Sequence, residues 1–437
     1  MNFPMQRYNF ALNCIFNYLS HRDLCVCSLV NKNWCQNVKT NIWNKPDFIT
    51  EETTSLQAFQ QFLKVIETIA SEQTRSLIQI IDVSQIQESL YETIDENWLL
   101  IIIQRCPKLR SLIIRDASFL TTTSIRKLCS SLKQPHGFLE HLDLSNSKNI
   151  TEITLKSLIQ NFPELVQITL DNCSGVSDSS ISQIIYYCHD LHTINIANSR
   201  SCVTDTSIFA IAKFGKQKLR RVNFQSLQKI SDNSIIALSN YCKNLVSINL
   251  SNCSLITCKA LESLLTANKN TLEELIIHNM RSIPILESSF IGLLIRCLNL
   301  TTLSISLGYI ILTSFVNHFS LGSSSKSPPL YTPKFSGNDA RLILDLFEQF
   351  QSLQALLLHN VPEHTSTEFL WNLFEICGRR GNCTLKDVKI YRTSYESDFI
   401  LGGYAKVKQN EINQESVNNF NKNHSNGPNI ELLLLEE

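Results

Sequence analysis

Apolar residues recur along most of this chain in units that combine two periodicities. From Leu165 the sequence reads LVQITLDNCSGVSDSSISQIIYYCHD, and the lines that open at Leu191, Leu219 and Leu245 repeat its template. Each line alternates apolar and polar residues over its first positions, which is typical of a strand, and then carries an apolar cluster at helical spacing. A unit of this kind cannot bury its apolar face alone. The pattern therefore predicts a curved α/β solenoid of stacked strand–helix repeats.

The predicted array extends over residues 77–392, beginning with a degenerate first repeat at 77–80. Regular repeats open at Leu109, Leu139, Leu165, Leu191, Leu219, Leu245, Leu272 and Leu300, and a later pair opens at Leu353 and Leu385. The strand alternation sends residues such as Ile168 and Leu170 into the core, and the helices add residues such as Ile181.

The first fifty residues follow a different pattern, in which apolar residues at helical spacing predict three short helices. Their apolar positions are Leu12, Ile15, Phe16 and Leu19, then Leu24, Cys27 and Val30, then Trp34, Val38, Ile42 and Trp43. Three helices of this length cannot bury all these side chains against one another, so the module is expected to need a partner. The alternative is an N-terminal cap that packs on the first repeat.

The spacing of these residues, IF-x-x-L-x-x-x-D-L-x-x-x-x-x-V-x-K-x-W with a later I-W, resembles the F-box. The usual opening Leu-Pro falls at Arg7-Tyr8 here, and the usual Cys before the Lys is Asn31. The resemblance implies a three-helix module over residues 7–48 that docks on a Skp1-like adaptor, and through it on a cullin. Under that resemblance the adaptor contacts are Leu12, Ile15, Phe16, Leu19, Leu24, Val30, Trp34 and Trp43.

Three segments separate or follow these parts. Residues 49–76 contain Phe59, Phe62, Leu63, Ile66 and Ile69 at helical spacing, which predicts a linking helix. Residues 319–338 are rich in Ser, Gly and Pro and predict an exposed insertion, either disordered or regulatory. Residues 393–437 are mostly polar and predict a mobile tail, although its apolar end could dock back.

Six of the fifteen cysteines stand at repeated positions, namely Cys106, Cys173, Cys188, Cys242, Cys253 and Cys297. Cys188 and Cys242 are two repeats apart, hence roughly 10 Å, whereas a disulfide needs Cα atoms within about 7 Å. They are interpreted as small buried side chains in a reducing compartment, cytoplasmic or nuclear. The period and these cysteines resemble the cysteine-containing subclass of leucine-rich repeats found in F-box proteins.

Charge and motifs limit the functions that fit. Lys plus Arg and Asp plus Glu number 39 each, so no charge excess favours nucleic acid or a membrane surface. The apolar run at 98–103 is far shorter than the roughly 20 residues of a membrane span. No phosphate-binding, hydrolase or zinc-protease motif occurs, and His21, Cys25, Cys27 and Cys35 lack the paired spacing of a zinc site. We expect no cofactor, no metal and no catalysis by this chain.

The outward strand positions then form the expected binding surface, on the concave side of the solenoid. The candidate contacts to a protein substrate are Arg115, His141, Asp143, Gln167, Asp171, Asn195, Arg221, Asn223, Asn249, Glu274 and His278. Arg115, Arg221, Glu274 and His278 are the strongest candidates because charged and ring side chains often anchor partners. Histidines such as His141, His192 and His278 are expected to be exposed. The alternative is a solvated face without a ligand.

These observations favour a substrate-receptor subunit of an Skp1–cullin–F-box ubiquitin ligase, with a ligase-independent interaction scaffold as the alternative.

Overall fold

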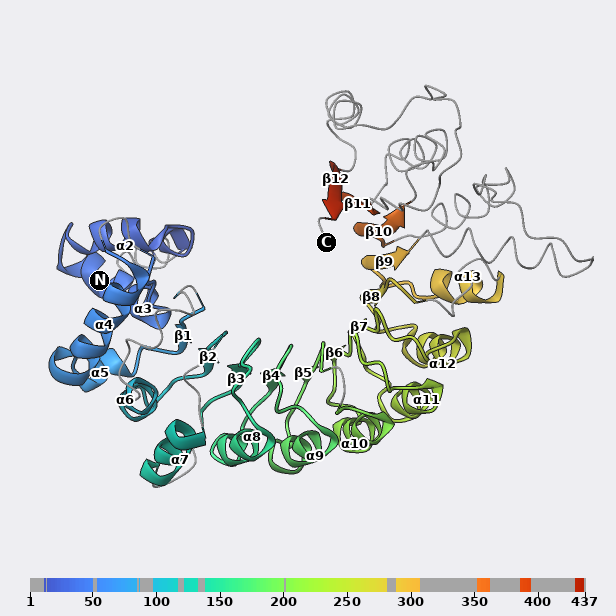
Figure 1. Cartoon of the computed structure of the whole chain (residues 1–437). Coiled ribbons are helices and arrows are strands. Elements are labelled where there is room, and N and C mark those ends of the chain that lie inside the picture. Colours follow the sequence, from blue (N-terminus) through green and yellow to red (C-terminus); the bar gives the residue numbers. More distant parts are fainter. Residues whose placement is uncertain are drawn as a thin grey trace, which may run out of the picture. The chain divides into compact units, whose positions relative to one another are not determined.

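The computed structural model contains two compact units, Met1–Cys202 and Val203–Glu437, which are described separately. It describes residues 12, 14–49, 53–84, 86, 97–116, 122–132, 138–199, 202–280, 288–306, 352–361, 386–393 and 429–435. Figure 1 shows a helical N-terminal part, then strands alternating with helices from β1 to β9, and then the strands β10 to β12.

The N-terminal module contains helices α2 (His21–Ser28) and α3 (Lys32–Asn44). Each helix begins at a side-chain cap, because Ser20 Oγ accepts the Asp23 N–H at 3.2 Å and Asn31 Oδ1 accepts the Trp34 N–H at 2.9 Å. Asn31, the departure from the usual F-box residue, therefore has a defined structural role.

The predicted linking helix is interrupted. Helix α4 (Ser55–Lys64) continues into a π-helical turn (Val65–Ile69) and is followed by the short helix α5 (Glu72–Arg75). The Ala70 N–H donates to Val65 O at 2.7 Å, five residues back, so the turn holds one residue more than an α-helical turn. This extra residue rotates Ile69 out of the apolar face, and its side chain is 75% exposed. The prediction of Ile69 as part of that face was wrong.

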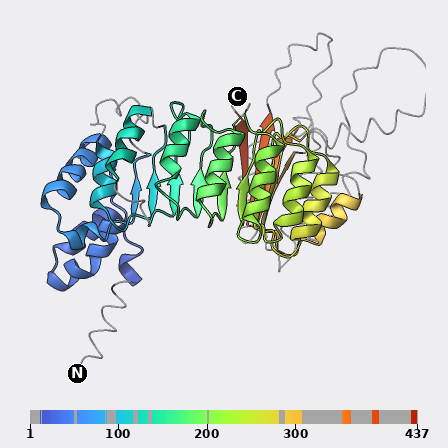
Figure 2. The same ribbon diagram turned by 90° about the horizontal axis from the view of Figure 1, so that it is seen from below.

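In the first unit, five parallel strands pair in chain order. These are β1 (Ile80–Asp82), β2 (Ser111–Ile113), β3 (His141–Asp143), β4 (Gln167–Thr169) and β5 (Thr193–Asn195). The helices are α6 (Trp98–Arg105), α7 (Thr122–Ser131), α8 (Glu152–Ile159) and α9 (Asp178–Tyr187). The helices lie along one side of the strands and leave the other side as a strand face (Figure 1, Figure 2).

The second unit continues the same alternation with seven parallel strands. These are β6 (Arg221–Asn223), β7 (Ser247–Asn249), β8 (Glu274–Ile277), β9 (Thr302–Ser306), β10 (Ala355–Val361), β11 (Asp387–Thr393) and β12 (Asn429–Leu435). Its helices are α10 (Asp205–Gly215), α11 (Asp232–Tyr241), α12 (Cys258–Asn268) and α13 (Ser288–Ile295).

The core consists of the columns that the alternation predicts. The first strand column is buried throughout and contains Leu112, Leu142, Ile168, Ile194, Val222, Ile248, Leu275 and Leu303. The second is equally buried and contains Ile114, Leu144, Leu170, Ile196, Phe224, Leu250, Ile277 and Ile305. Helix residues such as Ile181 and Ile235 complete the core. Because each column crosses every repeat of its unit, removing one side chain affects two neighbouring repeats.

The apolar end of the predicted tail docks back on the array, as its sequence allowed, and residues 394–428 of that tail lie outside the described residues. Strand β12 pairs with β11 over its whole length, from Asp387 opposite Asn429 to Thr393 opposite Leu435. Strand β11 offers the apolar stretch IELLLL an edge of unpaired backbone N–H and C=O groups, so the stretch pairs there and extends the sheet. The predicted insertion at 319–338 lies outside the described residues. None of the described helices is long and apolar enough to cross a membrane.

Candidate protein-binding surfaces

The N-terminal module has a small apolar core of its own. Leu12, Phe16, Leu24 and Val38 are buried in it, and Leu19, Cys27, Trp34 and Ile42 pack against them partly buried. The rings of Phe16 and Trp34 meet edge to face with centroids 5.4 Å apart. Three of the predicted adaptor contacts, Leu12, Phe16 and Leu24, are therefore core residues of the module, because they fall on its inward helical face.

The module also carries exposed apolar side chains. Tyr18 is 90% exposed and Leu29 is 84% exposed, while Ile15, Val26 and Val30 are each more than half exposed. Val26 and Leu29 are three residues apart around the end of α2, so they share a side of it that is opposite the buried Leu24. Exposed apolar residues this close in sequence, on so small a module, are typical of a surface that a partner covers.

The predicted adaptor contacts thus divide into groups. Ile15 and Val30 are exposed, and Leu19, Trp34 and Trp43 are half-buried. Tyr18, Val26 and Leu29 were missed by sequence reasoning. Their signal was present, because each is an apolar residue out of phase with the inward helical face.

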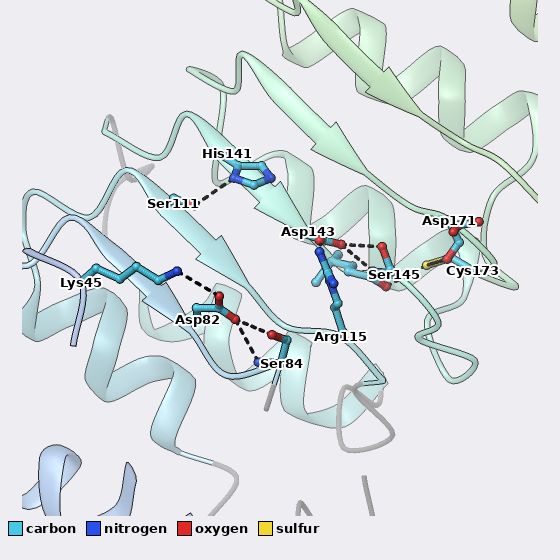
Figure 3. Close-up of polar contacts among 11 residues, drawn as sticks. Lys45, Asp82, Ser84, Ser111, Arg115, His141, Asp143, Ser145, Asp171 and Cys173 are labelled. Carbon is cyan, nitrogen blue, oxygen red and sulfur yellow. Dashed lines mark hydrogen bonds and ion pairs between the residues drawn. The ribbon is translucent and has the colours of Figure 1, made fainter. Parts of the chain in front are cut away.

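The module is joined to the first repeat by polar and aromatic contacts. Lys45 Nζ lies 3.4 Å from Asp82 Oδ2 in β1, and the Gln79 N–H donates to Asn44 O at 3.0 Å (Figure 3). The ring of Phe59 in α4 packs edge to face against Phe48, 5.1 Å away, and against Trp98 of α6, 5.3 Å away. This chain of contacts fixes α4 between the module and the array.

On the strand face, many of the expected substrate contacts have a structural role. Strands β1, β3, β5, β6 and β7 each end in Asp or Asn, whose side-chain oxygen accepts the backbone N–H two residues later at 3.0–3.1 Å. These residues are Asp82, Asp143, Asn195, Asn223 and Asn249. The third residue after Asp143, Asn195 and Asn249 has a positive φ. These residues are Asn146, Asn198 and Asn252, and Asn tolerates this left-handed conformation well. In these five repeats the polar side chain therefore holds the turn that follows the strand.

Asp143 illustrates this most clearly, since it is buried rather than exposed as predicted. Its Oδ1 accepts the Ser145 N–H at 3.0 Å and the Ser145 hydroxyl at 2.5 Å, and its Oδ2 accepts the Arg115 Nε–H at 3.0 Å (Figure 3). A buried carboxylate needs such donors. Asp143 therefore orients Arg115, whose side chain stays 51% exposed. The terminal nitrogens of Arg115 retain donor capacity for a partner's carboxylate.

The predicted exposure of three histidines was wrong, because all three are half-buried between neighbouring repeats. His141 Nδ1 lies 2.9 Å from Ser111 Oγ, and burial lowers the pKa of His141 below its ordinary value. His192 Nδ1 lies 2.6 Å from Asp190 O. His278 Nδ1 lies 3.0 Å from Ser251 Oγ.

His278 also stacks on His359 of β10, with ring centroids 4.1 Å apart. Burial lowers the pKa of His278 to about 4, and burial together with the neighbouring ring lowers that of His359 to about 3. The pair is neutral at physiological pH. It supplies an uncharged, half-buried pair of rings, in place of the exposed ring predicted at His278.

The other expected contacts lie on the strand face with varied environments. Arg221 is exposed, and Gln167 is half-buried. Glu274 Oε2 accepts the Ser247 hydroxyl at 2.5 Å, and Asp171 Oδ1 accepts the Asn198 amide at 2.8 Å. Arg115 and Arg221 are the predicted residues with the most side chain available to a partner.

The regular spacing of the repeat cysteines corresponds to buried thiols that bond across repeats. Cys173 Sγ lies 2.9 Å from Leu144 O, and Cys253 Sγ lies 3.1 Å from Phe224 O, each one repeat back. Burial raises the pKa of the Cys173 and Cys253 thiols to about 12. A thiol with so high a pKa is a poor nucleophile, so these cysteines act in packing.

Comparison with known proteins agrees with this division of the chain. The F-box-like family model matches residues 11–49. The Antagonist of mitotic exit network protein 1 of Saccharomyces cerevisiae is 30% identical over 121 residues, 24% of this chain and 22% of the relative. The protein of the same name from Candida glabrata is 30% identical over 133 residues, 30% of this chain and 25% of the relative. Lysine-specific demethylase 2B of Mus musculus is 24% identical over 267 residues, 57% of this chain and 18% of the relative.

These matches span a quarter or less of each relative's length. Among solved structures, the crystal structure of the Rad7 and Elc1 complex in yeast includes a similar chain. The similarity covers 81% of this chain and 89% of that one, with a TM-score of 0.44 and 15% identity. The family match and the strand pairing give the chain an F-box-like domain at residues 11–49, followed by strand–helix repeats whose strands pair in parallel.

Proposed function

We propose that this chain is the substrate-receptor subunit of an Skp1–cullin–F-box type ubiquitin ligase. The observation that carries the proposal is the F-box-like match at residues 11–49 on a module that exposes Ile15, Tyr18, Val26, Leu29 and Val30. A small domain that leaves such side chains in water gains stability when a partner covers them. The proposed partner is a Skp1-like adaptor, and through it a cullin.

The proposed mechanism is proximity. The adaptor is held by the N-terminal module and the substrate by the strand face, while a separate enzyme transfers ubiquitin to a substrate lysine. The contacts of Lys45 and Phe59 with the first repeat, together with the packing of Phe48 on Phe59, support this role, because a stiff connection keeps the bound substrate at a defined place. Holding two reactants together raises their effective concentration without chemistry by the receptor.

On the substrate side, Arg115 and Arg221 are the proposed anchors. Arg115 is oriented by Asp143 and has donors left over, which favours a substrate segment that carries carboxylates. The repeat cysteines act as packing residues, so a thioester with ubiquitin is not part of the mechanism. We place the complex in the cytoplasm or the nucleus, where buried thiols such as these stay reduced.

The second candidate function is a ligase-independent interaction scaffold. The observation that favours it is the aromatic contact of Phe59 with Phe48 and Trp98, since a cap on the array would pack in the same way. Under this alternative the module closes the end of the solenoid and recruits no adaptor.

Two single variants separate these functions in cells. Leu29→Asp places a charge on the exposed side of α2, and Arg115→Glu reverses a strand-face charge while leaving the module intact. Proteins that co-purify with the full chain would be compared between wild type and variants, together with their ubiquitin content and abundance.

Under the receptor function, Leu29→Asp keeps the bound proteins but removes their ubiquitin, whereas Arg115→Glu loses the bound proteins and keeps the adaptor. If the bound proteins carry the same ubiquitin and reach the same abundance with Leu29→Asp as with wild type, the scaffold is the correct function. Ile69→Ala, at an exposed apolar site outside both surfaces, is the matched control.

A further inference from the structure

The helical side of the second unit contains a groove that the proposed function does not use. It lies against α11, α12 and α13 and has a volume of about 720 Å³. The three helices stand side by side in Figures 1 and 2, on the side of the sheet opposite the strand face. Its lining residues are Asn240, Lys243, Lys259, Glu262, Ser263, Thr266, Ala267, Gly292, Leu293 and Arg296.

The groove exists because the facing helices carry small side chains there. Ser263 and Ala267 are four residues apart, so they lie on one side of α12. Across from them, α13 has Gly292, and a Cβ atom built at that position would meet no atom within 4 Å. Glycine destabilises the interior of a helix relative to alanine, so helix formation does not explain Gly292. Its missing side chain instead leaves open the space that forms this part of the groove.

The charges around the groove are unbalanced. Lys243, Lys259 and Arg296 contribute three cations and Glu262 one carboxylate, in a chain whose charges otherwise cancel. Lys243 Nζ donates to the backbone oxygen of Ser239 at 2.7 Å. Among the described residues, Lys259 and Arg296 form no salt bridge. Their charges are available to a ligand.

The arrangement of the cations indicates the shape of that ligand. Lys243 follows α11, Lys259 is on α12 and Arg296 follows α13, and packed helices lie about 8–10 Å apart. The cations are therefore spread along the groove instead of converging on one point. A run of about six extended residues would cover that span. Asn240, Ser263 and Thr266 add polar groups along it.

We propose that this groove binds an acidic segment of a partner protein, in extended form, through carboxylate side chains that contact Lys243, Lys259 and Arg296. Such a contact would lie on the helical side, separate from both the strand face and the F-box-like module. It would give the chain a third protein-docking surface that works independently of substrate and adaptor.

The test uses the full chain and three short fluorescein-labelled peptides of one Ser/Gly framework, measured by fluorescence anisotropy. The first carries a run of Asp and Glu, the second has Asn and Gln at the same positions, and the third has a single phosphoserine. The acidic peptide is expected to bind at least about tenfold more tightly than its amide counterpart at low salt, and less tightly as salt is added.

Two variants locate the binding in the groove. Lys259→Glu/Arg296→Glu should weaken binding of the acidic peptide by about tenfold or more. Gly292→Leu fills the groove without changing any charge and should cause a comparable loss. The matched control is Lys213→Glu/Lys216→Glu, which makes the same charge change on exposed residues outside the groove and should have a much smaller effect.

Equal losses for the groove pair and the control pair would overturn the proposal, because they would indicate attraction by net charge alone. Equal binding of the acidic and amide peptides would overturn it as well, as would binding of the phosphoserine peptide alone. Adaptor binding by the F-box-like module is expected to be unchanged in every variant, so this test and that of the proposed function fail independently.

Discussion

Replacement of Phe59 by alanine tests the junction between the F-box-like module and the repeats. Phe59 is fully buried in α4, and its ring contacts Phe48 on the module side and Trp98 on the array side at centroid distances of 5.1 and 5.3 Å. Phe62 stacks beside it at 6.4 Å. No other described residue has ring contacts on both sides of this junction.

The expected loss follows from the buried area. A buried phenylalanine removes at least about 150 Å² from water, which at about 25 cal/mol per Å² corresponds to about 4 kcal/mol. Measured Phe→Ala changes in protein cores fall in the same range, roughly 3–5 kcal/mol. A loss of 4 kcal/mol raises the equilibrium constant for local opening about a thousandfold.

The assay is native-state hydrogen exchange followed by mass spectrometry, since repeat arrays depart from two-state unfolding. Protection should fall most in α4 and α6. It should fall less in α2 and α3, because the module's own core contains Leu12, Phe16, Leu24 and Val38 but not Phe59. Ile69→Ala is the control and should change protection very little. A fall in α4 protection of less than tenfold, or one no larger than that of the control, would refute the role assigned to Phe59.

Three further predictions concern the rest of the chain. The pKa of His278 is lowered to about 4 and that of His359 to about 3, from an ordinary 6.5, so unfolding takes up protons in acid. The stability contributed by the neutral pair is complete above about pH 6.5 and is lost as the pH falls toward 4. His359→Phe should therefore flatten the decline in melting temperature over that range, and an unchanged pH profile would contradict the assignment. Gly175→Ala would place a Cβ atom 2.5 Å from Ile150 O and should destabilise the chain by about 2 kcal/mol or more in urea denaturation, whereas Gly292→Ala, in open space, should be neutral or slightly stabilising. Iodoacetamide should modify the exposed thiols in the native state and spare the buried ones until denaturant is added, and early modification of any buried thiol would contradict the packing role. The exposed thiols are Cys14, Cys25, Cys35 and Cys202, and the buried ones are Cys106, Cys173, Cys188, Cys242, Cys253 and Cys297.

The core columns could be predicted from the sequence because burial in a repeat array depends on local periodicity. Leu142, Ile168 and Ile194 are all buried at the predicted positions, since a one-residue shift would turn every side chain of a strand to the other face. The buried cysteines followed from the same argument.

The polar positions were harder to predict because their fate depends on neighbouring repeats. Asp143 and Arg115 are 28 residues apart in sequence, and only the stacking of β2 on β3 brings them to 3.0 Å. The repeat period does not distinguish an Asn whose side chain holds the turn after a strand, such as Asn249, from an Asn whose side chain is available to bind a partner protein. The exposure of Ile69 depends on one extra residue in a helical turn, which an apolar pattern does not reveal.

The proposed adaptor surface shows a third kind of difference. The F-box resemblance predicts Phe16 and Leu24 as adaptor contacts, but both are buried in the module's core. Tyr18 and Leu29, which that prediction does not include, are the most exposed apolar residues of the module. A sequence pattern records the residues needed to build a module more strongly than those that touch its partner.

The most direct test of the central claim is the dissociation constant of the purified full chain for a purified Skp1 adaptor, measured by isothermal titration calorimetry. Wild type should bind, and Leu29→Asp should abolish binding while leaving the melting temperature unchanged, because Leu29 is 84% exposed and lies outside the module's core. Ile69→Asp, the same kind of apolar-to-Asp change at an exposed position outside the module, is the matched control for the added charge and should bind as tightly as wild type. Absence of binding by a folded wild type, or equal binding by Leu29→Asp, would contradict the adaptor-docking surface proposed for this chain.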